Sequence, residues 1–124
     1  MNGHEHLLLD TNVFIYLLSG NEFAARALVG KRLYYSFITE IELLSRPGLN
    51  ASEQKLIHSM LADCVKLTYS DQIGNATIKI RSSKHLKVPD AIIAATATVH
   101  GLPILTADRA FEKVETLQCI LFEL

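Results

Sequence analysis

Cysteine is scarce in this chain of 124 residues, which contains two cysteines and no CxxC pair. Cys64 and Cys119 each adjoin an apolar, strand-like run. The sequence therefore excludes a fold that depends on several disulfide bonds, and it excludes a zinc site with paired cysteine ligands. We expect both residues to be free thiols, buried as small hydrophobic side chains, in a protein of the reducing cytoplasm.

Long hydrophobic runs are also missing. Although 49% of the residues are hydrophobic, no apolar stretch approaches the roughly 18 residues that a membrane-spanning helix requires. The first six residues lack the positively charged segment and the apolar segment of a secretory signal. Because we find no repeat, low-complexity segment or linker, we expect residues 1–124 to form a single domain that makes no contact with a membrane.

Charge of one sign is not in excess, since 12 Lys and Arg face 13 Asp and Glu, for a net charge of −1. This balance excludes a protein whose affinity for nucleic acid comes from its overall charge. Two interpretations stay open for a local basic patch, either solvated helix surface or a set of phosphate contacts. The patch comprises Lys79, Arg81, Lys84 and Lys87, and Arg109 is a further candidate.

The hydrophobic pattern predicts alternating strands and helices. Three consecutive leucines at 7–9 are typical of a central parallel strand that is buried on both faces. We predict further strands at 32–39, 65–69, 103–106 and 119–122, helices at 13–18, 22–29, 40–45, 71–84 and 89–100, a helix from Asn50 or Ser52 to about Cys64, and a helical turn at 109–113. The alternation indicates an α/β fold with a parallel sheet and helices on both faces.

Acidic residues occur where a predicted strand ends or a predicted helix begins. They are Asp10, the pair Glu40 and Glu42, Asp90, and Asp108. Each has an ordinary interpretation by itself, as a helix cap, a helix-dipole contact or a turn residue. In a parallel sheet, however, these places share one edge, and clustered carboxylates repel one another unless a cation lies between them. The pattern therefore predicts a metal-binding pocket at that edge.

Four segments, in this order along the chain, resemble the motifs of PIN domains. They are LDTN at 9–12, SFITEIEL at 36–43, PDAIIAATA at 89–97 and LTADRAF at 105–111. The similarity is greatest to the small VapC toxins of bacterial and archaeal toxin–antitoxin pairs, and the stretch DAIIAATA is its most specific part. The resemblance implies one PIN domain with a central parallel sheet of about five strands, ordered 3-2-1-4-5, and helices on both faces. That order implies that Cys64 and Cys119 lie toward opposite edges.

The resemblance also implies which residues form the site. The catalytic and metal-binding acids would be Asp10, Glu42, Asp90 and Asp108, with Thr11, Asn12 and Thr106 as supporting residues. In the family motif, the second acid follows by three residues a Ser or Thr that opens its helix, and Thr39 fits that place. Glu40, two residues before Glu42, is expected on another face of the helix.

Oxygen ligands favour Mg²⁺ or Mn²⁺ over Zn²⁺, and no Cys or His lies near these motifs at a zinc-like spacing. A metal-activated water would attack phosphorus and leave a 5′-phosphate. The resemblance implies an endoribonuclease that acts on structured RNA such as tRNA or ribosomal RNA, between which the sequence does not decide. Arg81, Lys84, Lys87 and Arg109 are the candidate RNA contacts.

As a VapC-like toxin, the protein is expected to bind a small cognate antitoxin and to form a homodimer. Apolar side chains near the start of the fold are either surface kept for these partners or ordinary core; they are Phe14, Tyr16, Leu17, Phe23 and Leu44. Alternatives are a housekeeping PIN ribonuclease and a non-catalytic PIN module that binds RNA or protein. A phosphotransfer domain with Asp10 as its nucleophile is disfavoured, because a haloacid-dehalogenase-like fold would need Asp where Asn12 stands.

Overall fold

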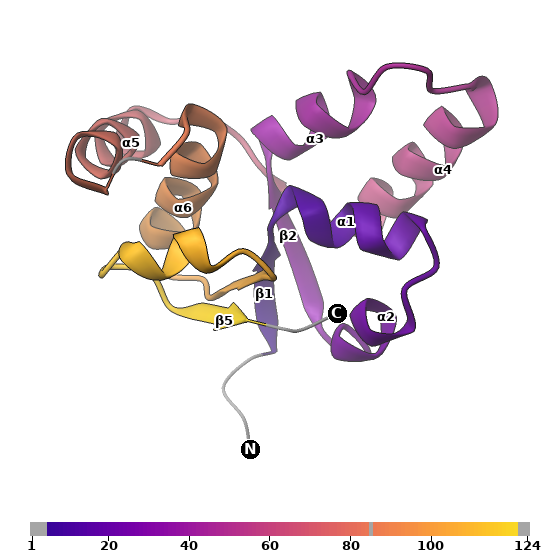
Figure 1. Cartoon of the computed structure of the whole chain (residues 1–124), viewed down its shortest axis with the longest axis horizontal. Helices are drawn as coiled ribbons and strands as arrows, with labels where there is room; N and C mark the ends of the chain where they lie inside the picture. Colours follow the sequence, from indigo (N-terminus) through magenta and orange to yellow (C-terminus); the bar gives the residue numbers. More distant parts are fainter. Residues whose placement is uncertain (1–4, 85, 122–124) are drawn as a thin grey trace.

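The computed structural model describes residues 5–84 and 86–121 of the chain. A parallel sheet forms its centre (Figure 1). Its five strands have the order β3-β2-β1-β4-β5, which confirms the predicted fold class and strand order. The strands are β1 His6–Leu9, β2 Arg32–Ser36, β3 Val65–Leu67, β4 Ile104–Thr106 and β5 Cys119–Leu121. Every neighbouring pair runs parallel, so all the carboxyl ends of the strands lie at one edge.

Helices cover both faces of the sheet. They are α1 Thr11–Leu18, α2 Glu22–Ala27, α3 Phe37–Leu44, α4 Ala51–Ala62, α5 Asp71–Lys84 and α6 Val88–His100, with a 3-10 helix, η1, at Arg109–Lys113. In Figure 1, α5 and α6 lie on one side of the sheet and α1 to α4 on the other. The leucines of β1 alternate between the two cores, since Leu8 packs with α5 and α6 whereas Leu7 and Leu9 pack with α1 and α4. This confirms that the strand is buried on both faces.

Helix α3 begins earlier than the sequence suggests. We predicted a strand to residue 39 and a helix opened by Thr39, but the strand ends at Ser36 and the helix begins at Phe37. The Ser36 hydroxyl accepts a hydrogen bond from the backbone N–H of Ile38 at 3.3 Å, as a helix cap does. This cap overrides the strand preference of Phe37 and Ile38. Thr39 therefore lies inside the first turn.

The structure also gives the other boundaries that the sequence left open or placed differently. Asn50, not Ser52, caps α4, and it forms a reciprocal capping box with Glu53. Helices α1 and α6 begin at Thr11 and Val88, slightly before the predicted starts. Phe122, the last residue of the predicted final strand, lies outside the described residues, which end in β5 at Leu121.

The two cysteines are free, as predicted, but each is only partly buried. Cys64 directly precedes β3 and Cys119 begins β5, and these strands form opposite edges of the sheet. Burial raises the pKa of the Cys64 thiol to about 11, so this thiol is protonated and unreactive at neutral pH. Across residues 5–84 and 86–121, the helices are all too short or too polar to span a bilayer.

Candidate active site

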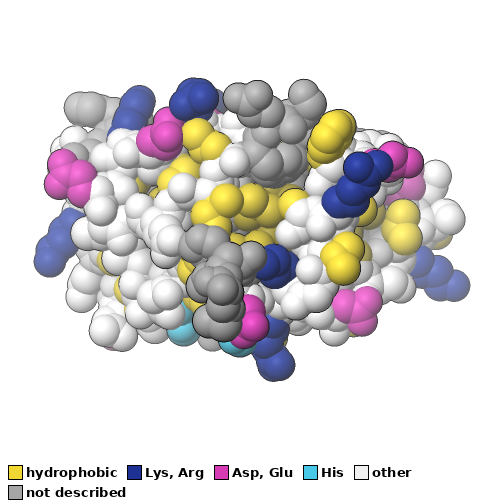
Figure 2. All heavy atoms as spheres, turned by 90° about the horizontal axis from the view of Figure 1, so that it is seen from below, with side chains coloured by type: hydrophobic (Ala, Val, Ile, Leu, Met, Phe, Trp, Pro, Cys, Tyr) yellow, Lys and Arg dark blue, Asp and Glu magenta, His cyan; other side chains and the backbone are white. Residues whose placement is uncertain are grey.

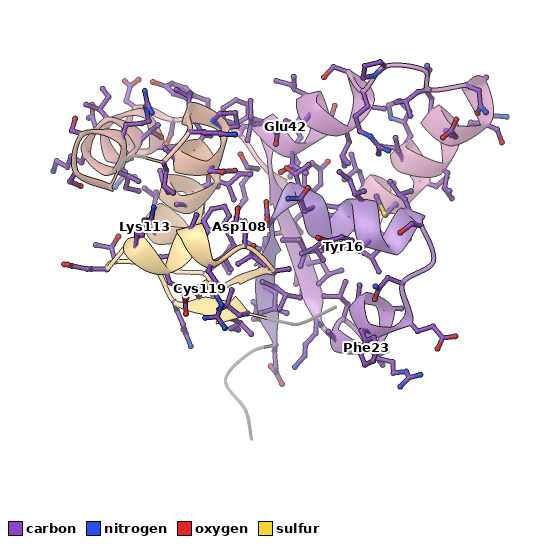
Figure 3. All side chains as sticks on the ribbon, viewed as in Figure 1. Tyr16, Phe23, Glu42, Asp108, Lys113 and Cys119 are labelled. Carbon is purple, nitrogen blue, oxygen red and sulfur yellow. The ribbon has the colours of Figure 1, made fainter. Side chains whose placement is uncertain are left out.

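The carboxyl edge of the sheet brings together the segments that carry the predicted acids. In the register of β1, Leu8 pairs with Tyr34 of β2, and Leu9 pairs with Leu105 of β4. The residues that follow these strands therefore leave the sheet side by side. Figure 3 shows Glu42 on α3 and Asp108 in the segment after β4, both near the upper end of β1.

At the opposite end of the molecule, acidic and basic side chains are interspersed around the rim (Figure 2).

Asp10 is the most buried of these acids, with 3% of its surface exposed. It occupies the N-cap position of α1, yet its side chain makes no capping hydrogen bond, so the simple capping interpretation is wrong. Its carboxylate instead accepts a hydrogen bond of 2.8 Å from the hydroxyl of Thr106. Burial, together with the negative charges of Asp90 and Asp108, raises the pKa of Asp10 to about 6 against the opposing effect of the Thr106 hydrogen bond.

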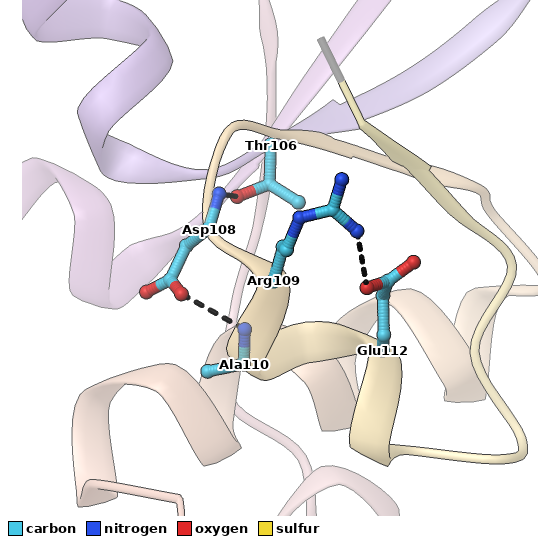
Figure 4. Close-up of polar contacts among 5 residues, drawn as sticks. All are labelled: Thr106, Asp108, Arg109, Ala110 and Glu112. Atoms are coloured by element: carbon cyan, nitrogen blue, oxygen red, sulfur yellow. Dashed lines mark hydrogen bonds and ion pairs between the residues drawn. The ribbon is translucent and has the colours of Figure 1, made fainter. Parts of the chain in front are cut away.

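Thr106 links two of the acids. Its hydroxyl donates to Asp10. The same hydroxyl accepts a hydrogen bond of 3.0 Å from the backbone N–H of Asp108, which Figure 4 shows. Asp108 is exposed, and one of its carboxylate oxygens accepts the N–H of Ala110 at 2.9 Å. The turn interpretation of Asp108 is therefore correct for that oxygen. Its charge nevertheless acts on both Asp10 and Asp90, because it raises the pKa of each.

Asp90 lies in the first turn of α6 and is partly buried. Burial raises the pKa of its carboxyl above the usual value, as do the charges of Asp108 and Glu42, whereas nearby Lys87 lowers it. The helix itself is held by a nearly continuous buried run from Ala91 to Ala97, as its all-apolar pattern predicts. The buried helix thus fixes the backbone that carries Asp90, within reach of the charges of Asp108 and Glu42.

A residue of α1 forms a hydrogen bond with the side chain of Glu42. The Thr11 hydroxyl donates a hydrogen bond of 2.7 Å to the Glu42 carboxylate and lies 2.9 Å from the Thr39 hydroxyl. The side chain of Thr11 therefore contacts Glu42, while its backbone is hydrogen-bonded to Asp10 and lowers the pKa of that carboxyl. Asn12 is exposed, and in the described part of the chain no hydrogen bond connects it with the acids. The contact between Thr39 and Thr11 was not foreseen, because no sequence pattern signals a pair of hydroxyls that face each other across two helices.

Glu40 points away from this group. Its carboxylate accepts a hydrogen bond of 3.5 Å from the Tyr35 hydroxyl and forms an ion pair of 3.2 Å with Lys66 on the edge strand β3. The two glutamates of α3 therefore face different neighbours, Glu40 toward the sheet edge and Glu42 toward Thr11. This arrangement agrees with the helical phase expected for residues spaced by two.

Within the described residues, no three His, Cys, Asp or Glu side chains are already arranged to hold a metal ion. The chemistry of the donors nevertheless fits a divalent cation. Asp10, Asp90, Asp108 and Glu42 offer only carboxylate oxygens. The charges of Asp90 and Asp108 raise the pKa of Asp10, and the charges of Asp108 and Glu42 raise the pKa of Asp90. A hard cation such as Mg²⁺ relieves that repulsion.

The basic residues of the predicted patch have different roles. Arg81 donates a hydrogen bond of 2.7 Å to the backbone carbonyl of Leu86, which ties α5 to the start of the next segment. Arg109 forms an exposed ion pair of 3.2 Å with Glu112 (Figure 4). The Lys84 side chain lies outside what the structure describes. Lys87 is close enough to Asp90 to lower the pKa of that carboxyl.

Comparison with known proteins gives the class of this fold and site. The PIN domain family model matches residues 7–117. The chain belongs to the PIN domain family, and its resemblance to the VapC-type members of that family is confirmed. No curated protein matches the sequence.

Solved structures of toxin–antitoxin complexes have the same fold. A toxin–antitoxin complex from Klebsiella pneumoniae is 28% identical with a TM-score of 0.83, over 95% of this chain and 99% of that chain. FitAcB from Neisseria gonorrhoeae is 26% identical with a TM-score of 0.76, over 91% and 95%. VapBC2 from Rickettsia felis, solved with a fragment of promoter DNA, is 16% identical over 95% and 99%, and its TM-score of 0.85 shows likeness of fold alone.

Proposed function

We propose that this PIN domain is a metal-dependent endoribonuclease and the toxin of a VapBC-type pair. One observation carries the nuclease proposal: the parallel strands bring the four acids to one edge of the sheet, where Asp10 is buried and its pKa is raised by the charges of Asp90 and Asp108. Carboxylates with raised pKa values in one group are a frequent mark of a catalytic site. The toxin proposal is supported by the similarity to a toxin–antitoxin complex over nearly the whole length of both chains.

The four acids would hold Mg²⁺ or Mn²⁺, which when bound supplies positive charge for the phosphate and lowers the pKa of a coordinated water. Thr106 fixes one oxygen of Asp10, and Thr11 fixes one oxygen of Glu42. These hydrogen bonds orient both carboxylates, and the bond from Thr106 also lowers the pKa of Asp10. Above a pH of about 6, Asp10 is ionised and ready to bind a cation.

Two helices add positive potential at the same edge. The N-termini of α1 and α6 have no side-chain cap, whereas Asn21, Ser36 and Asn50 cap α2, α3 and α4. Uncapped backbone N–H groups at a helix N-terminus favour a phosphate group. Lys87, at the N-cap position of α6, is the side chain that we propose for a phosphate contact, with Arg81, Lys84 and Arg109 as outer contacts.

A groove between α1 and α4 is the surface that we propose for the antitoxin. It has a volume of about 260 Å³, and its lining includes the apolar side chains of Ile15, Leu18 and Leu56 with Arg46 and Glu53. Such a groove fits the apolar face of a short helix.

The apolar side chains considered for partner binding differ in their exposure. Phe14 is core, because it is fully buried, whereas Phe23 on α2 is 63% exposed. Tyr16, Leu17 and Leu44 are partly buried. Figure 3 shows Tyr16 and Phe23 on the side of the molecule formed by α1 and α2. Phe23 therefore offers a second apolar contact for the antitoxin.

A second copy of the chain is the partner that we propose for the other exposed apolar residues. Ile41 on α3, Ile78 on α5 and Val88 on α6 each expose half or more of their surface. Helix α6 packs against both α3 and α5, and exposed large apolar side chains on neighbouring helices are typical of a protein interface. Sedimentation velocity of the wild type beside Ile78→Glu tests this homodimer; a monomeric wild type would contradict it.

Expression in a bacterial host tests the toxin proposal. We expect induction of the wild type to arrest growth, and induction of Asp10→Asn not to. Co-expression of the small gene that neighbours the toxin gene should restore growth. Unimpeded growth with folded protein that cleaves RNA in vitro would contradict the toxin role and favour a housekeeping ribonuclease.

A further inference from the structure

Thr39 is a buried hydroxyl beside the site that the proposed chemistry does not use. Its side chain is 0% exposed and lies in the first turn of α3. Its Oγ1 is 2.9 Å from the Oγ1 of Thr11, which begins α1. The Thr11 hydroxyl is in turn 2.7 Å from Oε1 of Glu42. Three side chains from two helices thus form a chain of hydrogen bonds that ends on one of the acids.

The direction of these hydrogen bonds follows from counting protons. A hydroxyl has a single proton, and an ionised carboxylate has none to donate. Thr11 must therefore use its single proton in the hydrogen bond to Glu42. Only the lone pairs of the Thr11 oxygen are then left to face Thr39. Thr39 is consequently the donor to Thr11. Hydrogen bonds therefore run from Thr39 to Thr11 and from Thr11 to Glu42.

We propose that Thr39 is a positioning residue that orients Glu42 through Thr11. The proposal rests on the proposed function, in which Glu42 helps to hold the divalent cation. By donating to Thr11, Thr39 fixes the rotation of that hydroxyl and strengthens the bond that Thr11 makes to Glu42. Without this donor, the Thr11 hydroxyl is free to turn toward another acceptor, and the carboxylate loses a fixed direction.

The same hydrogen bonds fix the position of the start of α1 relative to α3. Thr11 follows Asp10 directly, and Glu42 lies one turn of helix after Thr39. A link from Thr39 to Thr11 therefore fixes the carboxylate of the second acid relative to the first. A cation shared by Asp10 and Glu42 needs this relative placement, because metal affinity depends on ligands that are already oriented.

A purely structural role for Thr39 makes a different prediction. If Thr39 only fills space, valine serves equally well, because its shape is nearly the same and it lacks only the hydroxyl. Serine would then be the worse substitute, since it removes a buried methyl group. If Thr39 acts by donating a hydrogen bond, serine is the better substitute and valine the worse one. The pair Thr39→Val and Thr39→Ser is therefore a matched test.

The experiment is titration of the purified, metal-free full chain with Mn²⁺ by calorimetry. We expect Thr39→Val to weaken Mn²⁺ binding by about 3- to 10-fold, toward the low end of the effect of hydrogen-bond partners of metal ligands. Thr39→Ser should bind within about twofold of the wild type. In a Thr11→Val background, Thr39→Val should have no further effect, because its route to Glu42 is already broken.

Three results would overturn the proposal. They are Mn²⁺ binding by Thr39→Val that equals the wild type, weaker binding by Thr39→Ser than by Thr39→Val, and effects of Thr39→Val and Thr11→Val that simply add. Far-UV circular dichroism checks that each variant is folded, and Thr39→Ala replaces the valine variant if that variant does not fold. A wild type that binds no Mn²⁺ contradicts the proposed function itself. Wild-type binding that Glu42→Gln weakens but Thr39→Val leaves unchanged contradicts the positioning role alone.

Discussion

The hydroxyl of Thr106 donates a hydrogen bond of 2.8 Å to the carboxylate of Asp10, across 96 positions of sequence. It joins the ends of the neighbouring central strands β4 and β1, and both residues are buried. The bond lowers the pKa of Asp10, while burial and the charges of Asp90 and Asp108 raise it to about 6. The ionisation of Asp10 is therefore set by a balance between two effects. Hydrogen bonds from Thr106 and from the Thr11 backbone favour the carboxylate, whereas burial and the neighbouring negative charges disfavour it.

Replacing Thr106 with Val should move the acid limb of the pH–rate profile to higher pH. Without the hydroxyl, the larger of the two hydrogen bonds that lower the pKa of Asp10 is lost, so a larger share of the carboxyl stays protonated at a given pH. We expect activity near neutral pH to fall by about tenfold or more. Thr106→Ser keeps the hydroxyl and should retain the wild-type profile. An acid limb that Thr106→Val does not move would contradict this role.

The metal-free protein should become more stable as the pH falls from 7 to 5. An acid with a pKa raised from 3.8 to about 6 binds its proton more tightly in the folded state than in the unfolded chain. The resulting stability is fully present below pH 3.8 and is lost as the pH rises through about 6. For Asp10, the change between pH 7 and 5 is about 1 kcal/mol.

Urea unfolding in EDTA at the two pH values measures this change. Asp10→Asn should be more stable than the wild type at pH 7, because it removes a buried charge, and its stability should rise less on acidification. An Asp10→Asn protein that is less stable than the wild type at pH 7 would show that the carboxylate stabilises the fold.

A divalent cation should raise the melting temperature of the metal-free protein. The ion binds the folded state and relieves repulsion among the four carboxylates, which adds about 2.7 kcal/mol at a hundredfold excess over Kd. For a domain of this size the shift is several degrees. Differential scanning fluorimetry with Mg²⁺ and Mn²⁺ measures it, and Asp90→Asn should reduce the shift. An unchanged melting temperature in millimolar Mn²⁺ would count against the cation site.

Glu42→Gln should reduce activity far more than Glu40→Gln, although both remove one negative charge from the same helix. Glu42 is held by Thr11 beside the other acids, whereas Glu40 pairs with Lys66 at the sheet edge. We expect a loss of about a hundredfold for Glu42→Gln and less than about threefold for Glu40→Gln. Initial rates with one labelled RNA compare them. The opposite order would show that Glu40 is the catalytic acid.

Much of the fold could be predicted because its signals are local. The leucines at 7–9 require burial on both faces, and the apolar run that follows Asp90 leaves no polar side for solvent. Strands that alternate with helices then require a parallel sheet, which places the strand ends at one edge. The order of the strands was available only through the resemblance to PIN domains.

The segments that meet at the candidate site could be predicted from the sequence, but the contacts among their side chains could not. Ser36 and Thr39 are both suitable caps, and only the folded backbone shows that Ser36 caps α3 while Thr39 turns toward Thr11. Such pairings join side chains that are distant in sequence, so no periodicity marks them. The hydrogen bond from Arg81 to the Leu86 carbonyl could not be predicted for the same reason, because the charge of Arg81 indicates only a possible RNA contact.

Cleavage of RNA by wild type, Asp10→Asn and Glu40→Gln tests the central claim most directly. The initial rate is measured with Mn²⁺ and again with excess EDTA. The account predicts rapid cleavage with 5′-phosphate ends by the wild type and by Glu40→Gln, none in EDTA, and a rate at least about a hundredfold lower for Asp10→Asn. Cleavage that persists in EDTA, or an Asp10→Asn protein as active as the wild type, would contradict it.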